Sequence, residues 1–335
     1  LLMERIVLAP LTAMTNSANR IAEGAYDVVL PERRKDEIGT LSSAFNSMAA
    51  EVKKHTENLE GLVNQRTAEL SRTNERLEAV NQQVMESIRY AGMMQDSVMV
   101  TEESLAERFA SHRLFFRQRD DVGGDFLYIR DVEEGFLVAV IDCEGHGVSG
   151  ALMTMMVNSF LQQITARRSA DDPAAILHEL DAEVAASLRQ NEGHASTHRG
   201  LDIGLCACFP GREELIFASA GMPLYVLESD RTINVTRGRT KAIGYLHRKE
   251  PQPFENQHFG IEGRAFCMVT DGYVDQAGGE SGRAFGTKRL FSMLQRCDPE
   301  DLAESGPEWE TAFEKYRGSY AQRDDVLALI FNVNR

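Results

Sequence analysis

The stretch Phe136-Leu-Val-Ala-Val-Ile-Asp-Cys-Glu-Gly-His-Gly147 passes from six apolar residues directly into an acid and two glycines. A short apolar run rich in β-branched residues is typical of a buried strand. Asp142 then stands at the end of that strand, where neighbouring glycines let another group approach closely. The stretch predicts a sheet in which at least one strand ends in a carboxylate.

The same local pattern recurs at three other places in the chain. Asp125 follows Gly123-Gly124, Asp271 follows the apolar run 267–270 and precedes Gly272, and Asp324 and Asp325 precede the apolar run 326–331. Each acid taken alone is ordinarily a turn or cap residue. If the strand ends converge, however, the carboxylates repel one another unless divalent cations neutralise them. Ligand sets made only of oxygen favour Mg²⁺ or Mn²⁺.

Residues from about 112 onward read as short strands and helices in mixed order. Predicted strands are Leu114–Gln118, Phe126–Arg130, Phe136–Asp142, Asp202–Phe209, Leu215–Ala218, Leu224–Leu227, Ala265–Thr270 and Val326–Val333. Predicted helices are Gly150–Ala166, Pro173–Gln190, Gly286–Leu294 and Glu308–Gln322. Because strands and helices do not alternate strictly, the fold class is α+β rather than a doubly wound parallel sheet.

The first part of the chain has heptad spacing instead. One apolar seam comprises Val7, Leu11, Met14, Ala18 and Ile21, and a second comprises Ile38, Leu41, Phe45, Met48 and Val52. A connector of about a dozen residues joins them. A single helix pair cannot bury both seams, so we expect a homodimeric four-helix bundle.

A third seam continues beyond this pair. It comprises Leu59, Val63, Arg66, Leu70, Thr73, Leu77, Val80 and Val84. An extra step of four between Val52 and Val63 is a stutter, which locally unwinds a coiled coil, and the polar seam residues weaken it. Residues 55–100 therefore read as a parallel dimeric coiled-coil linker, and both a shifting helix and a rigid spacer remain open.

Composition limits the remaining classes. The chain has 335 residues and a net charge of −15, which argues against general nucleic-acid binding. The five cysteines are odd in number, and free thiols are the simplest interpretation. No apolar run has the roughly 20 residues of a membrane helix. Because the sequence opens Leu1-Leu2-Met3, we expect a segment of a longer chain.

Residues 1–54 resemble a HAMP domain. The resemblance is carried by Pro10, the connector Gly24-Ala-Tyr26 and the stretch Asp36-Glu-Ile-Gly-x-Leu41. In that family the module follows a membrane span and relays a signal by repacking parallel helices. The resemblance implies the cytoplasmic portion of a bacterial inner-membrane sensor, attached to the membrane through segments outside this sequence.

Residues 87–333 resemble the PPM family of metal-dependent Ser/Thr protein phosphatases, in its SpoIIE/RsbU branch. The matching pieces are Val122-Gly-Gly-Asp125-Phe126, Asp142-x-x-Gly145-His146-Gly147, Ser219-Ala-Gly221-Met-Pro223, Thr270-Asp271-Gly272, Phe285-Gly286-x-x-Arg289-Leu290 and Gln322-Arg323-Asp324-Asp325. The order of HAMP domain, coil and this domain is similar to the SiaA-like sensor phosphatases. The implied fold is a β-sandwich flanked by helices, over residues 101–335.

The resemblance also implies a metal site with two divalent cations, Mn²⁺ or Mg²⁺. Asp142 would bridge them, the backbone carbonyl of Cys143 would complete one site, and Asp125, Asp271 and Asp324 would hold the second cation. Asp142 and Asp271 are the residues expected to be catalytic, since cations held there activate a water for attack on phosphorus.

Three residues have a weaker claim to this site. Asp325 would share the ligand role of Asp324. Glu144 would touch a water of the metal site, although a solvated loop acid is the ordinary alternative. His146 would assist protonation of the leaving group, or serve as a hydrogen-bonded structural histidine.

The implied function is hydrolysis of phosphoserine or phosphothreonine on a small regulatory protein, in this branch usually a STAS-type anti-sigma-factor antagonist. The helix 87–95, with Ile88, Tyr90 and Gln95, looks like the family's regulatory helix ahead of the catalytic domain. One departure is Tyr128, which replaces an acid of many relatives and puts a third metal in doubt. The alternative is a catalytically weak signalling adaptor that keeps the fold and binds the phosphorylated partner.

Overall fold

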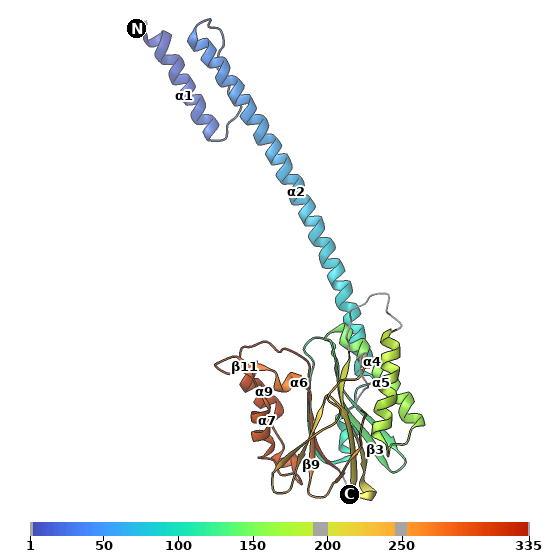
Figure 1. Cartoon of the computed structure of the whole chain (residues 1–335). Helices are drawn as coiled ribbons and strands as arrows, with labels where there is room; N and C mark the ends of the chain where they lie inside the picture. The colour runs from blue at the N-terminus through green and yellow to red at the C-terminus, as the bar shows by residue number, and fades with distance from the viewer. Residues whose placement is uncertain (1–2, 190–199, 245–252, 334–335) are drawn as a thin grey trace. The chain divides into compact units, whose positions relative to one another are not determined.

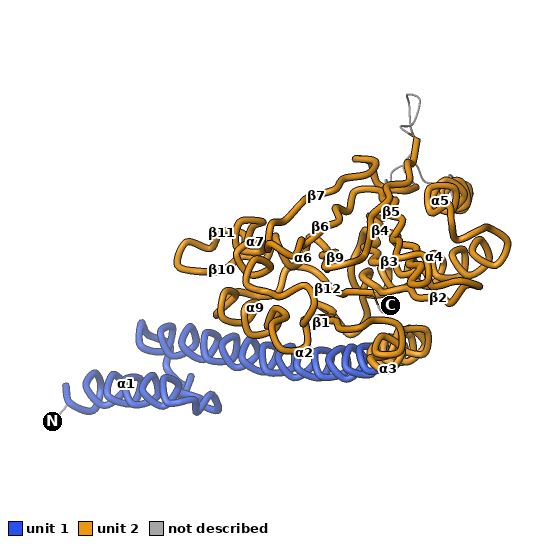
Figure 2. The backbone as a smooth tube through the Cα atoms, turned by 90° about the horizontal axis from the view of Figure 1, so that it is seen from below, with its two compact units in different colours: residues 1–84 blue, residues 85–335 orange. Residues whose placement is uncertain are grey.

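The computed structural model describes residues 3–189, 200–244 and 253–333. The chain divides into two compact units, residues 1–84 and residues 85–335 (Figure 2). The boundary lies within one long helix, α2 (Glu37–Asp96). Across the described ranges, no helix combines the length and the apolar character that a membrane span needs.

The first unit is helical. A π-helical turn (Glu4–Leu8) leads into α1 (Ala9–Ala22), and a connector joins α1 to α2. Asn46 of α2 fixes this connector, because its side chain accepts from the Leu30 amide at 2.8 Å and donates to the Leu30 carbonyl at 2.9 Å. The Asp36 carboxylate accepts from the Gly39 amide at 3.1 Å, at the start of α2. The two predicted helices and their connector are therefore present.

Helix α2 runs without a break over the second predicted seam and most of the predicted linker. Its seam residues are open to solvent in the single chain, since Leu70 is 64% exposed and Leu77 is 65% exposed. The stutter between Val52 and Val63 leaves the helix of one chain continuous.

The second unit contains two five-stranded antiparallel sheets (Figure 1). The first sheet has the order β1 (Phe109–Arg117), β12 (Val326–Val333), β9 (Ala265–Val269), β6 (Pro223–Leu227) and β7 (Ile233–Arg237). The second has the order β2 (Asp125–Val132), β3 (Gly135–Cys143), β4 (Leu201–Phe209), β5 (Glu214–Ala220) and β8 (Gln257–Gly260). Apolar side chains of both sheets, including Val140, Phe217, Phe266 and Leu329, interdigitate between them.

Helices cover both outer faces of this sandwich, and Figure 2 shows the sheets between them. The β2–β8 sheet packs against α4 (Val148–Arg167) and α5 (Pro173–Arg189). The β1–β7 sheet packs against α6 (Asp271–Val274), α7 (Thr287–Leu294), α8 (Leu302–Ser305) and α9 (Trp309–Arg317). Helix α3 (Glu102–Ala106), the 3₁₀ turn Pro210–Arg212 and the hairpin β10 (Ala277–Gly278)–β11 (Arg283–Ala284) complete the unit. The predicted α+β sandwich flanked by helices is confirmed.

Two differences from the predicted elements have simple causes. Strands β7 and β8 were not predicted, because both are short edge strands with polar residues and half-exposed patterns. The helix predicted over Glu308–Gln322 ends at Arg317, because Gly318 adopts a φ of 57°, which terminates an α-helix.

Candidate metal centre

Three carboxylates stand side by side at one end of the β2–β8 sheet. Asp125 of β2 lies directly opposite Asp142 of β3, and Asp142 lies directly opposite Asp202 of β4. Directly opposed residues of antiparallel strands share a face and have Cβ atoms about 5 Å apart. Two residues along from Asp142, Val140 packs between the sheets, so the three acids face the interior of the sandwich at its edge.

The other sheet contributes two acids to the same end. Asp271 follows β9 and begins α6, and Asp324 lies two residues before β12. Thr270 connects the sheets, because its hydroxyl donates to Asp125 Oδ2 at 2.7 Å and accepts from the Leu327 amide at 2.9 Å. The strand ends that the sequence pattern singled out therefore converge from both sheets.

Burial and mutual repulsion dominate the electrostatics of this carboxylate cluster, defined as Asp125, Asp142, Asp202, Asp271 and Asp324. Burial, followed by the charges of Asp271, Asp202 and Asp324, raises the pKa of Asp142 to about 8. Burial, followed by the charges of Asp271 and Glu144, raises the pKa of Asp202 to about 6. The pKa of Asp125 is raised by burial and then by Asp142, and that of Asp271 by burial and then by Asp324. Within the described ranges, no Lys or Arg side chain is a cause of these four shifts.

The donor set fits divalent cations. Carboxylates that raise one another's pKa without a compensating cation are stabilised in their charged form by a bound metal, and oxygen donors suit Mg²⁺ or Mn²⁺. The described side chains do not already form a group of three or more ligands at metal-binding geometry. Asp125 and Asp142 lie directly opposite each other on neighbouring strands, which brings the two carboxylates to the same place on the sheet.

The backbone around Cys143 packs tightly against the Gly123–Asp125 loop. A Cβ on Gly124 would lie only 2.4 Å from the Cys143 carbonyl oxygen, so only glycine fits there. The Cys143 side chain points the other way, into the core against α4, and burial raises the pKa of its thiol. The Cys143 thiol is therefore not available to the site as a thiolate.

Asp325 occupies a different position from the one expected of a metal ligand. Its Oδ1 accepts from the Arg119 amide and its Oδ2 accepts from the Gly124 amide, each at 2.7 Å, and the residue is 2% exposed. Both oxygens are thus used to hold the loop that carries Asp125. This geometry gives Asp325 a positioning role in place of a shared ligand role.

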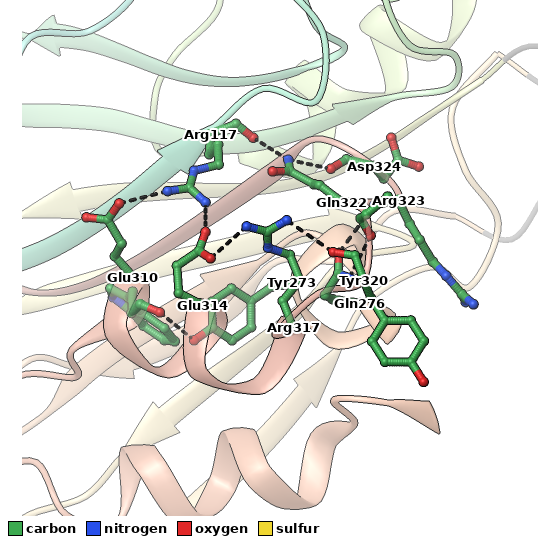
Figure 3. A network of polar contacts seen from close by, with 12 residues as sticks. Arg117, Tyr273, Gln276, Glu310, Glu314, Arg317, Tyr320, Gln322, Arg323 and Asp324 are labelled. Atoms are coloured by element: carbon green, nitrogen blue, oxygen red, sulfur yellow. Dashed lines mark hydrogen bonds and ion pairs between the residues drawn. The ribbon is translucent and has the colours of Figure 1, made fainter. Parts of the chain in front are cut away.

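The turn before Asp324 is fixed by amide side chains, as Figure 3 shows. Gln322 Nε2 donates to the carbonyl oxygens of Arg117 at 3.2 Å and Asp324 at 2.8 Å. Buried Gln276 accepts from the Arg323 amide at 3.2 Å and donates to the Ala321 carbonyl at 3.0 Å. The chain at the end of β1 therefore holds this turn at two points, through the bond from Gln322 to the Arg117 carbonyl and the bond from the Arg119 amide to Asp325.

Glu144 and His146 lie at the margin of the cluster. Glu144 accepts from the Gly200 amide at 3.2 Å, and its charge raises the pKa of Asp202. The His146 side chain is 55% exposed, with Nδ1 3.1 Å from Asp120 Oδ2 and 2.7 Å from Arg119 Nη2. His146 is thus held on the rim of the site by a charged pair.

Of the three residues proposed as regulatory, Gln95 reaches the site. It is 1% exposed, its Nε2 donates to the Gly123 carbonyl at 2.8 Å, and its Oε1 accepts from the Gly123 amide at 3.2 Å. Gln118 Nε2 also donates to Gln95 Oε1 at 3.2 Å. Ile88 is partly buried, whereas Tyr90 is 60% exposed. The last turn of α2 therefore holds the loop that precedes Asp125 through the hydrogen bonds of Gln95.

Tyr128 does not face the carboxylates. It is three residues from Asp125 on the same strand, so the two side chains point to opposite faces. The Tyr128 ring lies in the core against α4, where its hydroxyl is 2.8 Å from Thr165 Oγ1. The side chain at this position therefore lies on the opposite face of β2 from the carboxylate cluster.

Sequence analysis missed Asp202. The predicted strand Asp202–Phe209 already began with this acid, and period-two alternation places it on the same face as Cys206, which packs between the sheets. Unlike Asp125 and Asp271, Asp202 has no glycine directly beside it in the sequence. The glycine that makes room for Asp202 is Gly221 of the next connection, where a Cβ would collide with the Asp202 carboxylate.

Comparisons with known proteins agree with this architecture. The family model for stage II sporulation protein E (SpoIIE) matches residues 133–334, and the HAMP domain model matches residues 2–54. Phosphoserine phosphatase RsbP of Bacillus subtilis is 23% identical over 224 residues, which cover 65% of this chain and 51% of RsbP. The chain thus spans about half the length of that relative. Sensor protein SrrB of Staphylococcus aureus is 31% identical over 94 residues, 28% of this chain and 16% of SrrB.

Solved structures give the same result. The SiaA-PP2C domain of Pseudomonas aeruginosa superposes with a TM-score of 0.67 at 31% identity, over 76% of this chain and 99% of that chain. The PP2C phosphatase domain of SpoIIE from Bacillus subtilis superposes with a TM-score of 0.51 at 13% identity, over 68% of this chain and 64% of that chain, and shows the shared fold. The chain therefore belongs to the SpoIIE family of PP2C-type (PPM) serine/threonine phosphatases, with a HAMP domain ahead of the phosphatase domain.

Proposed function

We propose that this protein hydrolyses phosphoserine or phosphothreonine on a regulatory protein in a metal-dependent reaction. The observation that carries the proposal is the convergence of acids from both sheets into a cluster in which they raise one another's pKa. Asp142, Asp125, Asp271, Asp324 and the Cys143 carbonyl would hold two divalent cations, Mn²⁺ or Mg²⁺. When bound, such cations supply an activated water and neutralise charge on the phosphoryl group.

The chain's own residues set the geometry of this reaction. Asp142 lies centrally, opposite both Asp125 and Asp202, which suits it to bridge the cations. Asp325 and Gln95 hold the Gly123–Asp125 loop, and Thr270 fixes the orientation of the Asp125 carboxylate. Because these groups are buried and hydrogen-bonded in advance, little reorganisation is needed when ligands bind.

The deciding experiment measures phosphate release from a phosphoserine protein with and without Mn²⁺. We expect metal-dependent turnover that Asp142→Ala abolishes, with Asp230→Ala as a control because Asp230 lies in an exposed turn. Binding of the phosphoprotein without turnover, in the presence of Mn²⁺, would instead establish the adaptor alternative.

We propose a STAS-type anti-sigma-factor antagonist as the substrate. The support is membership of the SpoIIE family together with similarity to RsbP, whose name describes a phosphoserine phosphatase. The test is turnover of the phosphorylated STAS protein compared with an unrelated phosphoserine protein of similar size, and equal rates for both would remove this assignment.

We further propose that the protein is a homodimer that passes a signal from a membrane sensor through its HAMP domain. The exposed seam of α2 supports a second copy as partner, because Leu59, Val63, Leu70 and Leu77 are each at least 61% exposed in the single chain. The two hydrogen bonds between Gln95 and the Gly123 backbone support transmission of a movement of α2 to Asp125. A change in the packing of α2 would then alter the position of Asp125 and the affinity for metal.

A further inference from the structure

A basic groove lies on the outer helical layer of the phosphatase domain. It runs between α7 and α9, and its open volume is about 380 Å³. Its apolar floor includes Phe285, Met293 and Tyr316, and its cationic side chains are Arg289, Arg296 and Lys315. An apolar floor with charged edges is a common form of protein docking surface.

The charge of this groove is opposite to that of the chain. The protein has a net charge of −15, yet the residues that line the groove include three basic side chains (Arg289, Arg296 and Lys315) and no acidic one. Such a local reversal of sign favours a negatively charged ligand.

The acids of α9 do not neutralise the groove. Glu310 binds Arg117, and Glu314 binds both Arg117 and Arg317, on the side of α9 that faces β1 (Figure 3). Among the residues that the structure describes, Arg289, Arg296 and Lys315 form no ion pair with a carboxylate. Arg289 is held in place by stacking on Tyr316 at 4.6 Å and by donating to the Phe285 carbonyl at 2.6 Å.

The groove is physically joined to the carboxylate cluster. Phe285 of the floor packs edge-on against Tyr273 with ring centroids 5.2 Å apart, and Tyr273 is two residues from Asp271. The Gly286 amide, at the start of α7, donates to the Val274 carbonyl at the end of α6 at 2.8 Å. The groove and the acidic cluster therefore belong to one packed assembly of short helices.

We propose that this groove docks an acidic, amphipathic segment of the phosphoprotein substrate, an inference that rests on the proposed function. Selection of an acidic partner from an otherwise acidic protein surface needs a local cationic patch, and the three basic side chains of the groove supply one. In the groove, apolar side chains of the segment pack on Met293 and Phe285 while its carboxylates pair with Arg296 and Lys315.

The test uses the full 335-residue chain and two forms of one phosphoserine peptide. One form carries a helical tail of Glu and Leu joined by a flexible linker, and the other carries a tail in which Lys replaces Glu. The variant is Arg296→Glu/Lys315→Glu, since both side chains are exposed. The control is Lys288→Glu, an exposed lysine of α7 that does not line the groove.

We expect the acidic tail to lower KM for the wild-type protein and the double variant to raise that KM by about tenfold, as reversal of two partly exposed charges implies. We expect kcat, turnover of p-nitrophenyl phosphate and the Lys288→Glu control to be unchanged. Equal KM values for the two tails, or an equal loss in the control, would overturn the proposal.

A binding arm separates this proposal from the proposed function. Fluorescence anisotropy of the acidic tail without phosphoserine reports docking even if the protein hydrolyses nothing, whereas p-nitrophenyl phosphate reports catalysis without docking. Vesicles of phosphatidylglycerol provide the competing ligand. If the double variant lost vesicle binding but kept the acidic tail, the groove would be a lipid site and the docking proposal would be wrong.

Discussion

The Gln95 carboxamide forms a two-way pair with the backbone of Gly123, donating to its carbonyl at 2.8 Å and accepting from its amide at 3.2 Å. A buried backbone that loses both partners costs about 1–3 kcal/mol per unsatisfied group. Gln95→Ala should therefore weaken Mn²⁺ activation and lower the unfolding temperature. The measurement is phosphate release against Mn²⁺ concentration, with Met93→Ala as the control on the same helix, where the side chain is 61% exposed. An unchanged Mn²⁺ profile for Gln95→Ala would disconnect α2 from the metal centre.

Asp325 makes a second prediction, because its two oxygens each accept a backbone amide. Asparagine at this position keeps one acceptor and brings an NH₂ group against the other amide, so Asp325→Asn should destabilise the domain by about 1–3 kcal/mol. We expect the variant to lose activity because the Gly123–Asp125 loop is displaced, not because a metal ligand is removed. Excess Mn²⁺ should therefore restore little activity. Urea unfolding and Mn²⁺ titration measure the two effects. Full rescue by Mn²⁺ would instead make Asp325 a metal ligand.

Asp202 should contribute to metal affinity although it was not predicted from the sequence. It stands opposite Asp142, and burial with the charge of Asp271 raises its pKa to about 6. Asp202→Asn should weaken Mn²⁺ binding by about tenfold or more, in the range known for groups around a metal site. Isothermal titration with Mn²⁺ checks this, and the exposed Asp230→Asn serves as the matched control. Identical affinities would place Asp202 outside the metal centre.

The metal-free protein should lose stability as the pH rises. Burial raises the folded-state pKa of Asp142 to about 8, above the ordinary value of 3.8. A raised pKa means that the folded state binds the proton more tightly, so this stabilisation is complete below pH 4 and is lost as the pH rises towards 8. Asp142→Asn should flatten the dependence by up to about 1.4 kcal/mol per pH unit in that window. Urea unfolding in EDTA between pH 5 and pH 8 measures the slope, using Asp230→Asn for comparison; equal slopes would contradict the assignment.

The heptad phase of α2, which sets how its successive seams are oriented, should control phosphatase activity. Insertion of four residues after Val63 rotates the following seam relative to the preceding one, whereas insertion of seven residues preserves the heptad phase. We expect the four-residue insertion to change phosphatase turnover and the seven-residue insertion to leave it near the wild-type value. Sedimentation analysis of both proteins checks that neither insertion disrupts the proposed dimer. Equal turnover in the two insertions would argue for a plain spacer.

Local patterns were sufficient to predict an α+β fold and to single out the strand-end acids, whereas the sandwich architecture and the expected ligand roles came from the resemblance to the PPM family. In each case the apolar run indicates a buried strand, and the acid that follows it (Asp142 or Asp271) marks the end of that strand. The contribution of Asp202 depends on a register between β3 and β4 and on space left by Gly221, which lies in another connection. Such relationships depend on which strands pair and in which register, and local sequence patterns do not determine either.

Asp325 and Tyr128 show a related limit. Adjacent acids such as Asp324 and Asp325 look equivalent in sequence, yet the backbone directs Asp325 to the amides of Arg119 and Gly124. Tyr128 occupies the place of an acid in relatives, but strand alternation turns it towards α4 and away from Asp125. In both cases the direction of a side chain, rather than its chemical type, decided its role.

The late position of strand β12 in the sequence has a consequence for folding during synthesis. It is the second of the five strands of its sheet, between β1 and β9, and the turn that leads into it carries both Asp324 and Asp325. A chain whose synthesis has reached only residue 320 therefore lacks the strand that joins β1 to β9, and it lacks the Asp325 carboxylate that holds the Gly123–Asp125 loop. Pairing of β1 with a strand more than 200 residues later also slows folding. We expect nascent chains to be inert towards phosphoproteins, so that newly made molecules acquire activity only after synthesis has passed β12.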